Sequence, residues 1–176
     1  MKVGPVEIEC VRGDIAAQPG IDAVVNAANA ELLPGGGAAG AIHGAAGPDL
    51  ADECRALAPI EPGEAVITGG YQLPNRHVIH CLGPRWGIDR PEEELLAGCY
   101  REALRLADRH GLTSIAFPAI STGAFGYPLE PAARVAVRTV AAAASDLGSV
   151  RMVRFVLFSR PDHEAFQRAL NELKHA

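Results

Sequence analysis

Short runs of β-branched and small apolar residues alternate with helix-like segments along almost the whole chain. Such runs are typical of strands buried in a sheet, and the segments between them are long enough to cross over that sheet. This alternation favours an α/β sheet with helices on both faces. Strands are expected at 6–11, 23–27, 65–68, 77–82, 114–117 and 153–158, and helices at 49–58, 92–110, 131–147 and 161–174.

The first expected strand alternates apolar residues with Glu7 and Glu9. Alternation of this kind indicates a strand that has one face in solvent. We therefore expect this strand at an edge of the sheet, while the continuous apolar runs at 23–27 and 114–117 indicate buried parallel strands.

The chain has 176 residues, which is the size of one ordinary domain. At this size about two-thirds of the surface of the unfolded chain becomes buried on folding, which is enough for one hydrophobic core. We find no linker, low-complexity segment or internal repeat in the sequence. Residues 1–176 are therefore expected to form a single domain, and we expect it to be monomeric.

The formal net charge of −5 argues against a broad basic surface for nucleic acid. No two of the four cysteines stand within four residues of each other, so the spacing of a zinc site is absent and we expect no metal. The N-terminal residues have no long apolar segment of the kind found in signal peptides, and no apolar run is long enough to span a bilayer. We expect a soluble, cytoplasmic protein that does not associate with membranes.

Two glycine-rich stretches, at 34–40 and 121–126, follow the expected strands at 23–27 and 114–117. Ligands of α/β sheets bind beyond the carboxyl ends of the strands, where both stretches are expected. Glycines let backbone N–H groups approach a ligand, and the N-terminus of a following helix adds partial positive charge. Two such loops can hold the two phosphates of a pyrophosphate in an acidic protein that has no lysine cluster.

Three other motifs have glycines in similar positions. Gly35, Gly37 and Gly40 match the dinucleotide fingerprint in spacing, but residues 28–36 separate the strand from the second glycine, where the fingerprint needs an immediate turn. No Walker motif is present. Ser121 lies in a sequence that resembles a nucleophile elbow without its first glycine, so a serine esterase stays an alternative, although the chain is short for that fold.

An ordered set of motifs covers essentially the whole chain. It consists of Gly-Asp-Ile at 13–15, Val-Asn-Ala-Ala-Asn at 25–29, Gly-Gly-Gly at 35–37, Gly-Ala-Ile-His at 40–43 and Phe-Pro-x-Ile-Ser-Thr-Gly-x-Phe-Gly-Tyr at 117–127. In this order and spacing the sequence resembles a macrodomain of the MacroD type. The resemblance implies a three-layer α/β/α sandwich with a mixed central sheet. It also implies binding of ADP-ribose and, often, its hydrolytic release from modified macromolecules.

The resemblance assigns the adenine end of the ligand to three residues. Asp14 would accept a hydrogen bond from the adenine amino group, the Ile15 N–H would donate to the ring, and Phe158 would stack on it. A carboxylate at this place favours adenine over guanine, which presents a carbonyl group instead. The alternatives are an ordinary Gly-Asp turn for Asp14 and a core position for Phe158.

The resemblance also assigns the phosphates and the second, distal ribose. The residues implied in ligand binding there are Asn26, Gly35, Gly36, Gly37, Ala38, Ala39, Ser121, Thr122, Gly123, Ala124, Phe125, Gly126 and Tyr127. Asn29, His43, Gly123 and Phe125 are implied in catalysis, with Phe125 packed against the distal ribose. Asn29 could equally cap a turn through the backbone, and Asn26 is expected to brace its loop. Structural roles are also open for His43 and Phe125.

One departure from the family pattern bears on catalysis. MacroD-type hydrolases normally have Val-Asp-Gly after the three glycines, whereas this chain has Ala38-Ala39-Gly40. Ala39 can neither accept a proton nor orient water, and general-base assistance typically contributes ~10²–10⁴ in rate. A carboxylate is nevertheless a good leaving group, and a substrate phosphate could orient the water.

Two principal hypotheses follow from this departure. The chain is either a cofactor-independent hydrolase of mono-ADP-ribose on acidic side chains, or on DNA or RNA, or else a non-catalytic ADP-ribose reader. Deacetylation of O-acetyl-ADP-ribose is a related alternative. The expected partners are ADP-ribose, mono-ADP-ribosylated protein and ADP-ribosylated nucleic acid. We expect Trp86 to cover the core rather than contact the ligand.

Overall fold

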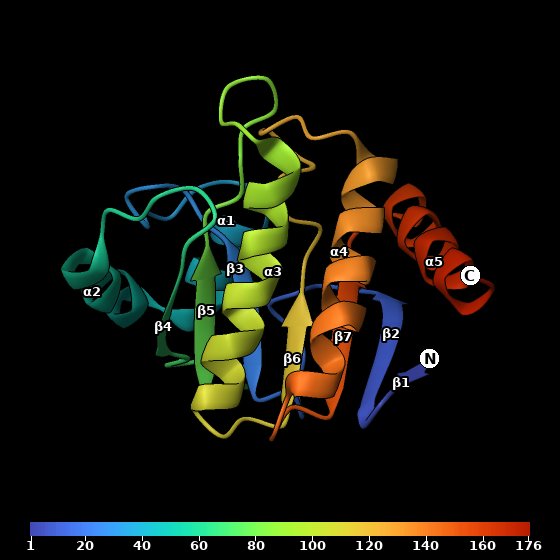
Figure 1. The fold of residues 1–176 in the computed structure, drawn as a ribbon. Helices are drawn as coiled ribbons and strands as arrows, with labels where there is room; N and C mark the ends of the chain where they lie inside the picture. Colours follow the sequence, from blue (N-terminus) through green and yellow to red (C-terminus); the bar gives the residue numbers. More distant parts are fainter.

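The computed structural model describes residues 1–176. Its strands are β1 (Lys2–Val3), β2 (Val6–Arg12), β3 (Ala23–Ala27), β4 (Ala65–Gly69), β5 (His77–Cys81), β6 (Ser114–Phe117) and β7 (Met152–Leu157). Its helices are α1 (Gly37–Ala46), α2 (Pro48–Leu57), α3 (Glu92–Arg109), α4 (Leu129–Ala143) and α5 (Arg160–Lys174), with a 3₁₀ turn at Ala144–Asp146. All strands join one sheet in the order β1-β2-β7-β6-β3-β5-β4 (Figure 1).

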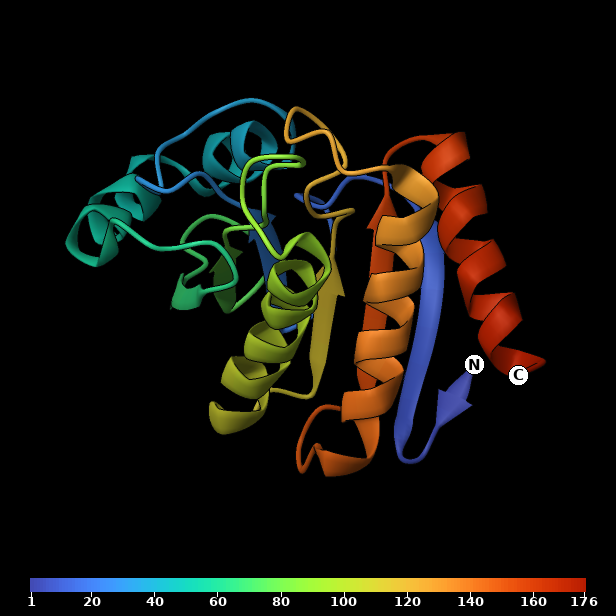
Figure 2. The same cartoon turned by 45° about the horizontal axis from the view of Figure 1, so that its top comes forward.

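The sheet is mixed, as expected. The five central strands are parallel to their neighbours, whereas β1 and β4 run antiparallel at the two edges. The carboxyl ends of the parallel strands therefore lie at one edge of the sheet. The loops that follow β3, β5 and β6 gather there (Figure 2).

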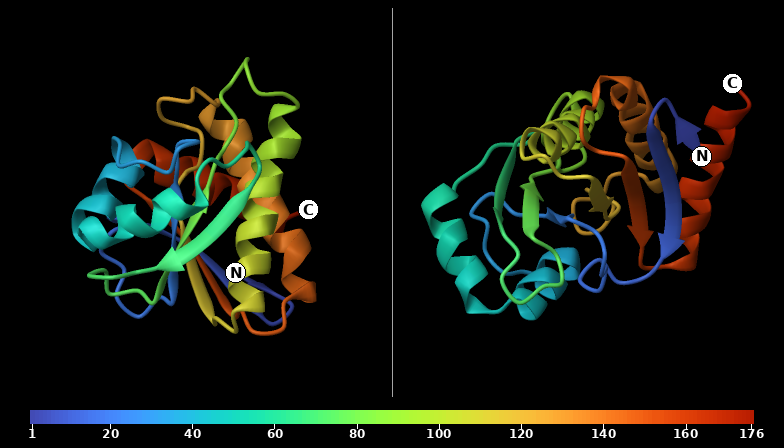
Figure 3. Two further views of the ribbon diagram at one scale, coloured as in Figure 1. Left: turned by 90° about the vertical axis from the view of Figure 1, so that its left-hand side faces the viewer. Right: turned by 90° about the horizontal axis from the view of Figure 1, so that it is seen from below.

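Helices cover both faces of the sheet because neighbouring strand residues point to opposite sides. Ala23 and Val25 of β3 face the larger core, with the helices α3, α4 and α5. Val24 faces the smaller core, which holds residues of α1 and α2. Figure 3 shows α3 and α4 on the side of the sheet opposite α1. This is the three-layer α/β/α sandwich that the resemblance implies.

The expectation of an edge position for the first predicted strand is wrong. β1, which is only two residues long and has no sequence pattern, lies outside β2. Glu7 and Glu9 are partly exposed for a different reason: Val6 and Ile8 pack into the larger core, while α1 and α2 on the other face lie over β3 and β4. Glu9 pairs with Arg154 of the neighbouring β7, with 2.7 Å between Oε1 and Nε.

The sequence places the opening of the helix that carries His43 after Gly40, whereas α1 begins at Gly37, inside the first glycine-rich stretch. Gly40 is thus inside this helix, where glycine is ordinarily unfavourable. A side chain at position 40 would collide with the carbonyl oxygen of Gly35, so the close approach of the preceding loop requires this glycine. No helix combines the length and the apolar character needed to cross a bilayer.

Candidate functional site

A cavity of about 610 Å³ opens at the carboxyl edge of the sheet. Its wall comes from the loops after β2, β3, β5 and β6, the end of β7 and the first turn of α5. Predicted residues on the wall are Asp14, Ile15, Asn29, Gly35, Gly36, Gly37, Ala38, Ala39, Ser121, Thr122, Gly123, Ala124, Phe125 and Phe158. The structure therefore brings the two glycine-rich stretches and the expected adenine site together in one cavity.

The end of the cavity over β2 and β7 is formed by Asp14, Ile15 and Phe158. The Asp14 Oδ1 accepts a hydrogen bond from the N–H of Ala16 at 2.8 Å, so one oxygen closes a turn, while Oδ2 has no partner within the chain. Phe158 is 84% exposed, which excludes the alternative of a core residue. This end therefore offers a free carboxylate oxygen beside an exposed aromatic ring.

Backbone N–H groups on the first glycine-rich stretch lack partners. The N–H groups of residues 35–39 donate no hydrogen bond within the chain. They include the first turn of α1, whose N-terminus no side chain caps. A Cβ added at Gly36 or Gly37 would meet nothing within 4 Å, so no side chain or backbone blocks access to these positions. Five donors at the positive end of a helix suit an anion.

The second glycine-rich stretch has the same property. Its turn is closed by hydrogen bonds from Gly126 N–H to Gly123 O and from Tyr127 N–H to Ser121 O, both 2.9 Å. The N–H groups of Ser121, Gly123, Ala124 and Phe125 remain without a partner. Both stretches line the cavity, so a ligand there can meet two separate groups of free donors.

Ser121 does not have the surroundings of a nucleophilic serine. It adopts φ +68° and its Oγ is buried without a hydrogen-bond partner. A Cβ at Gly83 would collide with that Oγ, which explains the glycine there. No histidine bonds the hydroxyl, so the base that activates a nucleophilic serine is missing.

Asn29 lines the cavity but its side chain also holds its own loop. Its Nδ2 donates to the carbonyl oxygen of Leu33 and its Oδ1 accepts from the N–H of Leu33, both at 2.9 Å. This is the backbone-capping arrangement that was the alternative for Asn29. The second N–H of the amide is unused and remains available to a ligand.

Four predicted site residues do not line the cavity: Asn26, His43, Gly126 and Tyr127. Asn26 is buried in β3, where its Nδ2 lies 3.0 Å from Nδ1 of His80 on β5. Gly126, at φ +76°, turns the chain away from the cavity. Tyr127 is then 4% exposed, with its ring 4.7 Å from that of Trp86.

His43 lies on the side of α1 that faces the sheet. Its ring is buried, and neither nitrogen has a hydrogen-bond partner. Burial lowers the pKa of His43, and burial together with His43 lowers the pKa of His80, 6.4 Å away between ring centroids, to about 3. Both imidazoles are therefore uncharged near neutral pH.

Sequence reasoning missed ten residues of the wall. They are Gly13, Ala27, Ala28, Ala41, Gly83, Pro118, Ala119, Ile120, Val156 and Asp162. Most of them flank predicted residues, but Asp162 enters from α5, whose first turn folds back over the end of β7. Together with Asp14 it supplies the carboxylates of the wall. Glu31 and Asp49, which flank the first glycine-rich stretch in sequence, do not line it.

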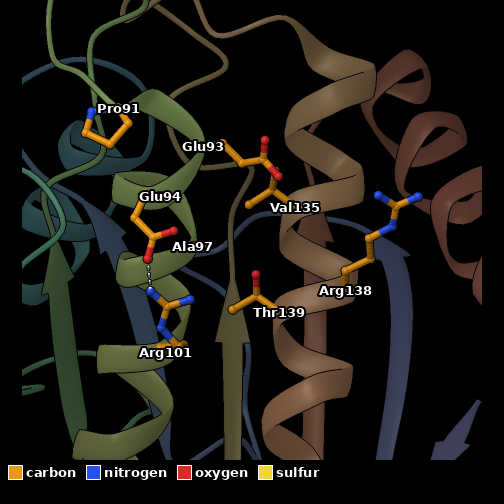
Figure 4. Close-up of a pocket in the computed structure, with 8 residues that line it drawn as sticks. All are labelled: Pro91, Glu93, Glu94, Ala97, Arg101, Val135, Arg138 and Thr139. Carbon is orange, nitrogen blue, oxygen red and sulfur yellow. Dashed lines mark hydrogen bonds and ion pairs between the residues drawn. The ribbon is translucent and has the colours of Figure 1, made fainter.

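A second hollow of about 520 Å³ lies between α3 and α4 (Figure 4). Its charged side chains have mixed signs, and Arg101 donates to Glu94 at 3.0 Å. Glu93 and Glu94 lie in the first turn of α3, where their N–H groups have no partner, but their own carboxylates stand beside these donors. The hollow therefore suits an anion less well than the cavity does.

Comparison with known proteins agrees with this geometry. A family model described as "Macro domain" matches residues 25–136. A macro domain-containing protein of Chlorobaculum tepidum, CT2219, is 49% identical over 94% of this chain and 96% of its own length. The ADP-ribose glycohydrolase MACROD2 of Xenopus laevis is 46% identical over 94% of this chain, which covers 40% of that protein.

Solved structures of macrodomains share the fold of this chain. A structure of the Oceanobacillus iheyensis macrodomain with ADP superimposes with a TM-score of 0.95, at 42% identity, over 99% of this chain and 95% of that one. The chain therefore belongs to the macrodomain family.

Proposed function

We propose that the protein binds ADP-ribose in the cavity at the carboxyl edge of the sheet and hydrolyses mono-ADP-ribose from acidic side chains of modified proteins. The observation that carries the binding is the pair of donor groups on the wall, at residues 35–39 and 121–125, none of which has a partner except the N–H of Thr122. Two phosphates joined by one oxygen match two adjacent groups of donors.

The two ends of the cavity fit the two ends of this ligand. Asp14 and Phe158 suit an adenine, through the free carboxylate oxygen and ring stacking. Asn29 and Phe125, at the other end, suit the distal ribose, since the amide of Asn29 can bond a sugar hydroxyl and the ring of Phe125 can pack against the sugar. The bound ADP of the Oceanobacillus protein and the naming of MACROD2 as an ADP-ribose glycohydrolase support ADP-ribose as the ligand class.

Hydrolysis would break the bond between the anomeric carbon of the distal ribose and an oxygen of the modified carboxylate. The carboxylate leaves with the electron pair, water adds to the anomeric carbon, and the proton of the water is released. Ala39 is 4% exposed and has no polar atom in its side chain, so no base stands at that position. We infer that a phosphate oxygen of the substrate, fixed by the free N–H groups, orients the water.

Release of free ADP-ribose from a carboxylate-linked mono-ADP-ribosylated protein tests this proposal. Multiple turnovers at catalytic protein concentration are expected. Tight binding of ADP-ribose without any release would instead favour the second candidate, a non-catalytic reader, for which the specific observation is Ala39. Absence of both binding and release would refute both candidates.

A further inference from the structure

The loop 83–91, which follows β5, exposes two large apolar side chains next to the candidate site. Trp86 is 46% exposed and Ile88 is 65% exposed. The Trp86 N–H donates to the carbonyl oxygen of Phe125 at 2.8 Å, which ties this loop to the wall of the cavity. Exposed apolar groups beside a binding cavity commonly mark a contact with a larger partner.

Polar contacts that do not involve the side chain of Ile88 hold the loop together. Asp89 accepts hydrogen bonds from the backbone N–H of Arg85 at 2.9 Å and from its guanidinium at 3.0 and 3.1 Å. Gly87 N–H donates to Glu92 at 3.2 Å. Ile88 therefore protrudes from a preformed loop without contributing to the hydrophobic core, so burial inside the chain does not explain an isoleucine there.

The order of the strands places this loop at one end of the cavity. The wall crosses the ends of β2, β7, β6, β3 and β5, with Asp14 and Phe158 over β2 and β7 and Gly83 at the start of the loop after β5. β5 is the outermost of these strands, so the rest of its loop extends outward from the end at which Asn29 and Phe125 stand. If the proposed function holds, the modified macromolecule is joined to the ligand at this end and must emerge beside the loop.

The charges of the loop favour a polypeptide over a nucleic acid. Loop 83–91 contains Arg85, Asp89 and Arg90, and three more carboxylates follow directly in the first turn of α3. Arg85 is paired with Asp89, and Nε of Arg90 lies 3.9 Å from a carboxylate oxygen of Glu92. Affinity for nucleic acid depends largely on cations that neutralise phosphates, and this loop has no cation without an acidic neighbour.

We propose that loop 83–91 is a docking surface for the polypeptide of a mono-ADP-ribosylated protein, with Trp86 and Ile88 contacting an apolar residue next to the modified side chain. This inference rests on the proposed function and adds a substrate preference to it. A modified peptide with an apolar residue beside the modified side chain should then bind more tightly than one with a polar residue there, although the ADP-ribose group is the same in both.

The test compares free ADP-ribose with two peptides that carry ADP-ribose through a non-cleavable link, one with leucine and one with serine beside the link. Ile88→Ser is the test variant, and Leu57→Ser on α2, 37% exposed and away from the cavity, is the matched control. Ile88→Ser should weaken binding of the leucine peptide about fivefold, the scale for losing burial of about one CH₂ group. It should leave the affinities for free ADP-ribose and for the serine peptide within about twofold. Leu57→Ser should change none of the three dissociation constants.

Two results would overturn the inference while the proposed function stands. One is equal binding of both peptides by the wild type with no effect of Ile88→Ser. The other is loss of affinity in Ile88→Ser for ADP-ribose linked to an oligonucleotide rather than to the leucine peptide, which would assign the loop to nucleic acid. Failure of the wild type to bind free ADP-ribose would refute the proposed function itself, and the docking surface with it.

Discussion

Asp14 offers the sharpest test of the adenine end, because its two carboxylate oxygens have different tasks. Oδ1 accepts from the N–H of Ala16 and closes a turn, whereas Oδ2 is free to accept from the adenine amino group. Asp14→Ala removes both contacts. Asp14→Asn can keep the first, through its amide oxygen, and presents an N–H donor to the adenine amino group in place of an acceptor.

The magnitude follows from the type of hydrogen bond. A bond to a charged group contributes about 1.5–3 kcal/mol, so Asp14→Ala should weaken ADP-ribose binding roughly 10- to 150-fold. Asp14→Asn should lose at least as much binding free energy, because the side-chain amide N–H then faces the adenine amino group, which is also a donor. The same amide can donate to the carbonyl oxygen of guanine, so this variant should also narrow the preference for ADP over GDP.

Isothermal titration with ADP-ribose, ADP and GDP measures these effects, and thermal unfolding is the control for folding. Asp14→Asn should unfold close to the wild-type temperature since its turn is intact. The reasoning is refuted if Asp14→Asn binds ADP-ribose as tightly as the wild type, or if its ratio of ADP to GDP affinity is unchanged, because the carboxylate would then not face the base.

Three further changes test other parts of the account. Gly123→Glu should weaken the binding of ADP-ribose at least tenfold in a titration, because a carboxylate would compete with phosphate for the free N–H groups. Gly123→Ala, whose Cβ meets no neighbour, should bind ADP-ribose nearly normally. Equal affinities of the two variants would contradict the placement of a phosphate at the second glycine-rich stretch. Ala39→Asp should raise turnover of a carboxylate-linked substrate by about 10²–10⁴ if a general base is what the site lacks, and an unchanged rate in a folded variant would show that it is not. Burial opposes ionisation of Asp108, but hydrogen bonds from the N–H groups of Gly148, Ser149 and Val150 hold its pKa at about 2. A carboxyl whose pKa is lowered in the folded state stabilises the protein above its unfolded pKa of about 3.9, so the free energy of unfolding should fall between about pH 4 and pH 2. Asp108→Ala should have a lower free energy of unfolding at neutral pH and should lose less of it over that range.

The sequence predicted the central strands well because burial on both faces demands continuous apolar runs. The predicted bounds of β3 and β6 agree with the structure for this reason. β1 has only two residues and could not be detected. The start of α1 was displaced because glycine is a poor helix former, and its use at position 40 follows from a tertiary contact with the preceding loop.

The candidate site was predictable where the function lies in the backbone, since both glycine-rich stretches follow strands that end at the same edge. The direction of a side chain was harder to predict, because His43 and Tyr127 lie only two positions from wall residues and yet are buried away from the cavity. Asp162 could not be placed, since its approach depends on how α5 packs beside β2 and β7. The two ends of the cavity could not be assigned from the sequence either, because the assignment depends on the order of the strands in the sheet.

Amide chemical shifts during titration with ADP-ribose report directly on which backbone N–H groups hold the phosphates. The N–H resonances of residues 35–39 and of 121, 123, 124 and 125 should shift strongly, since these donors acquire phosphate partners. Residues of the hollow between α3 and α4 should not shift. Saturable binding that leaves the two glycine-rich stretches unperturbed would contradict the account, because the phosphates would then be held elsewhere.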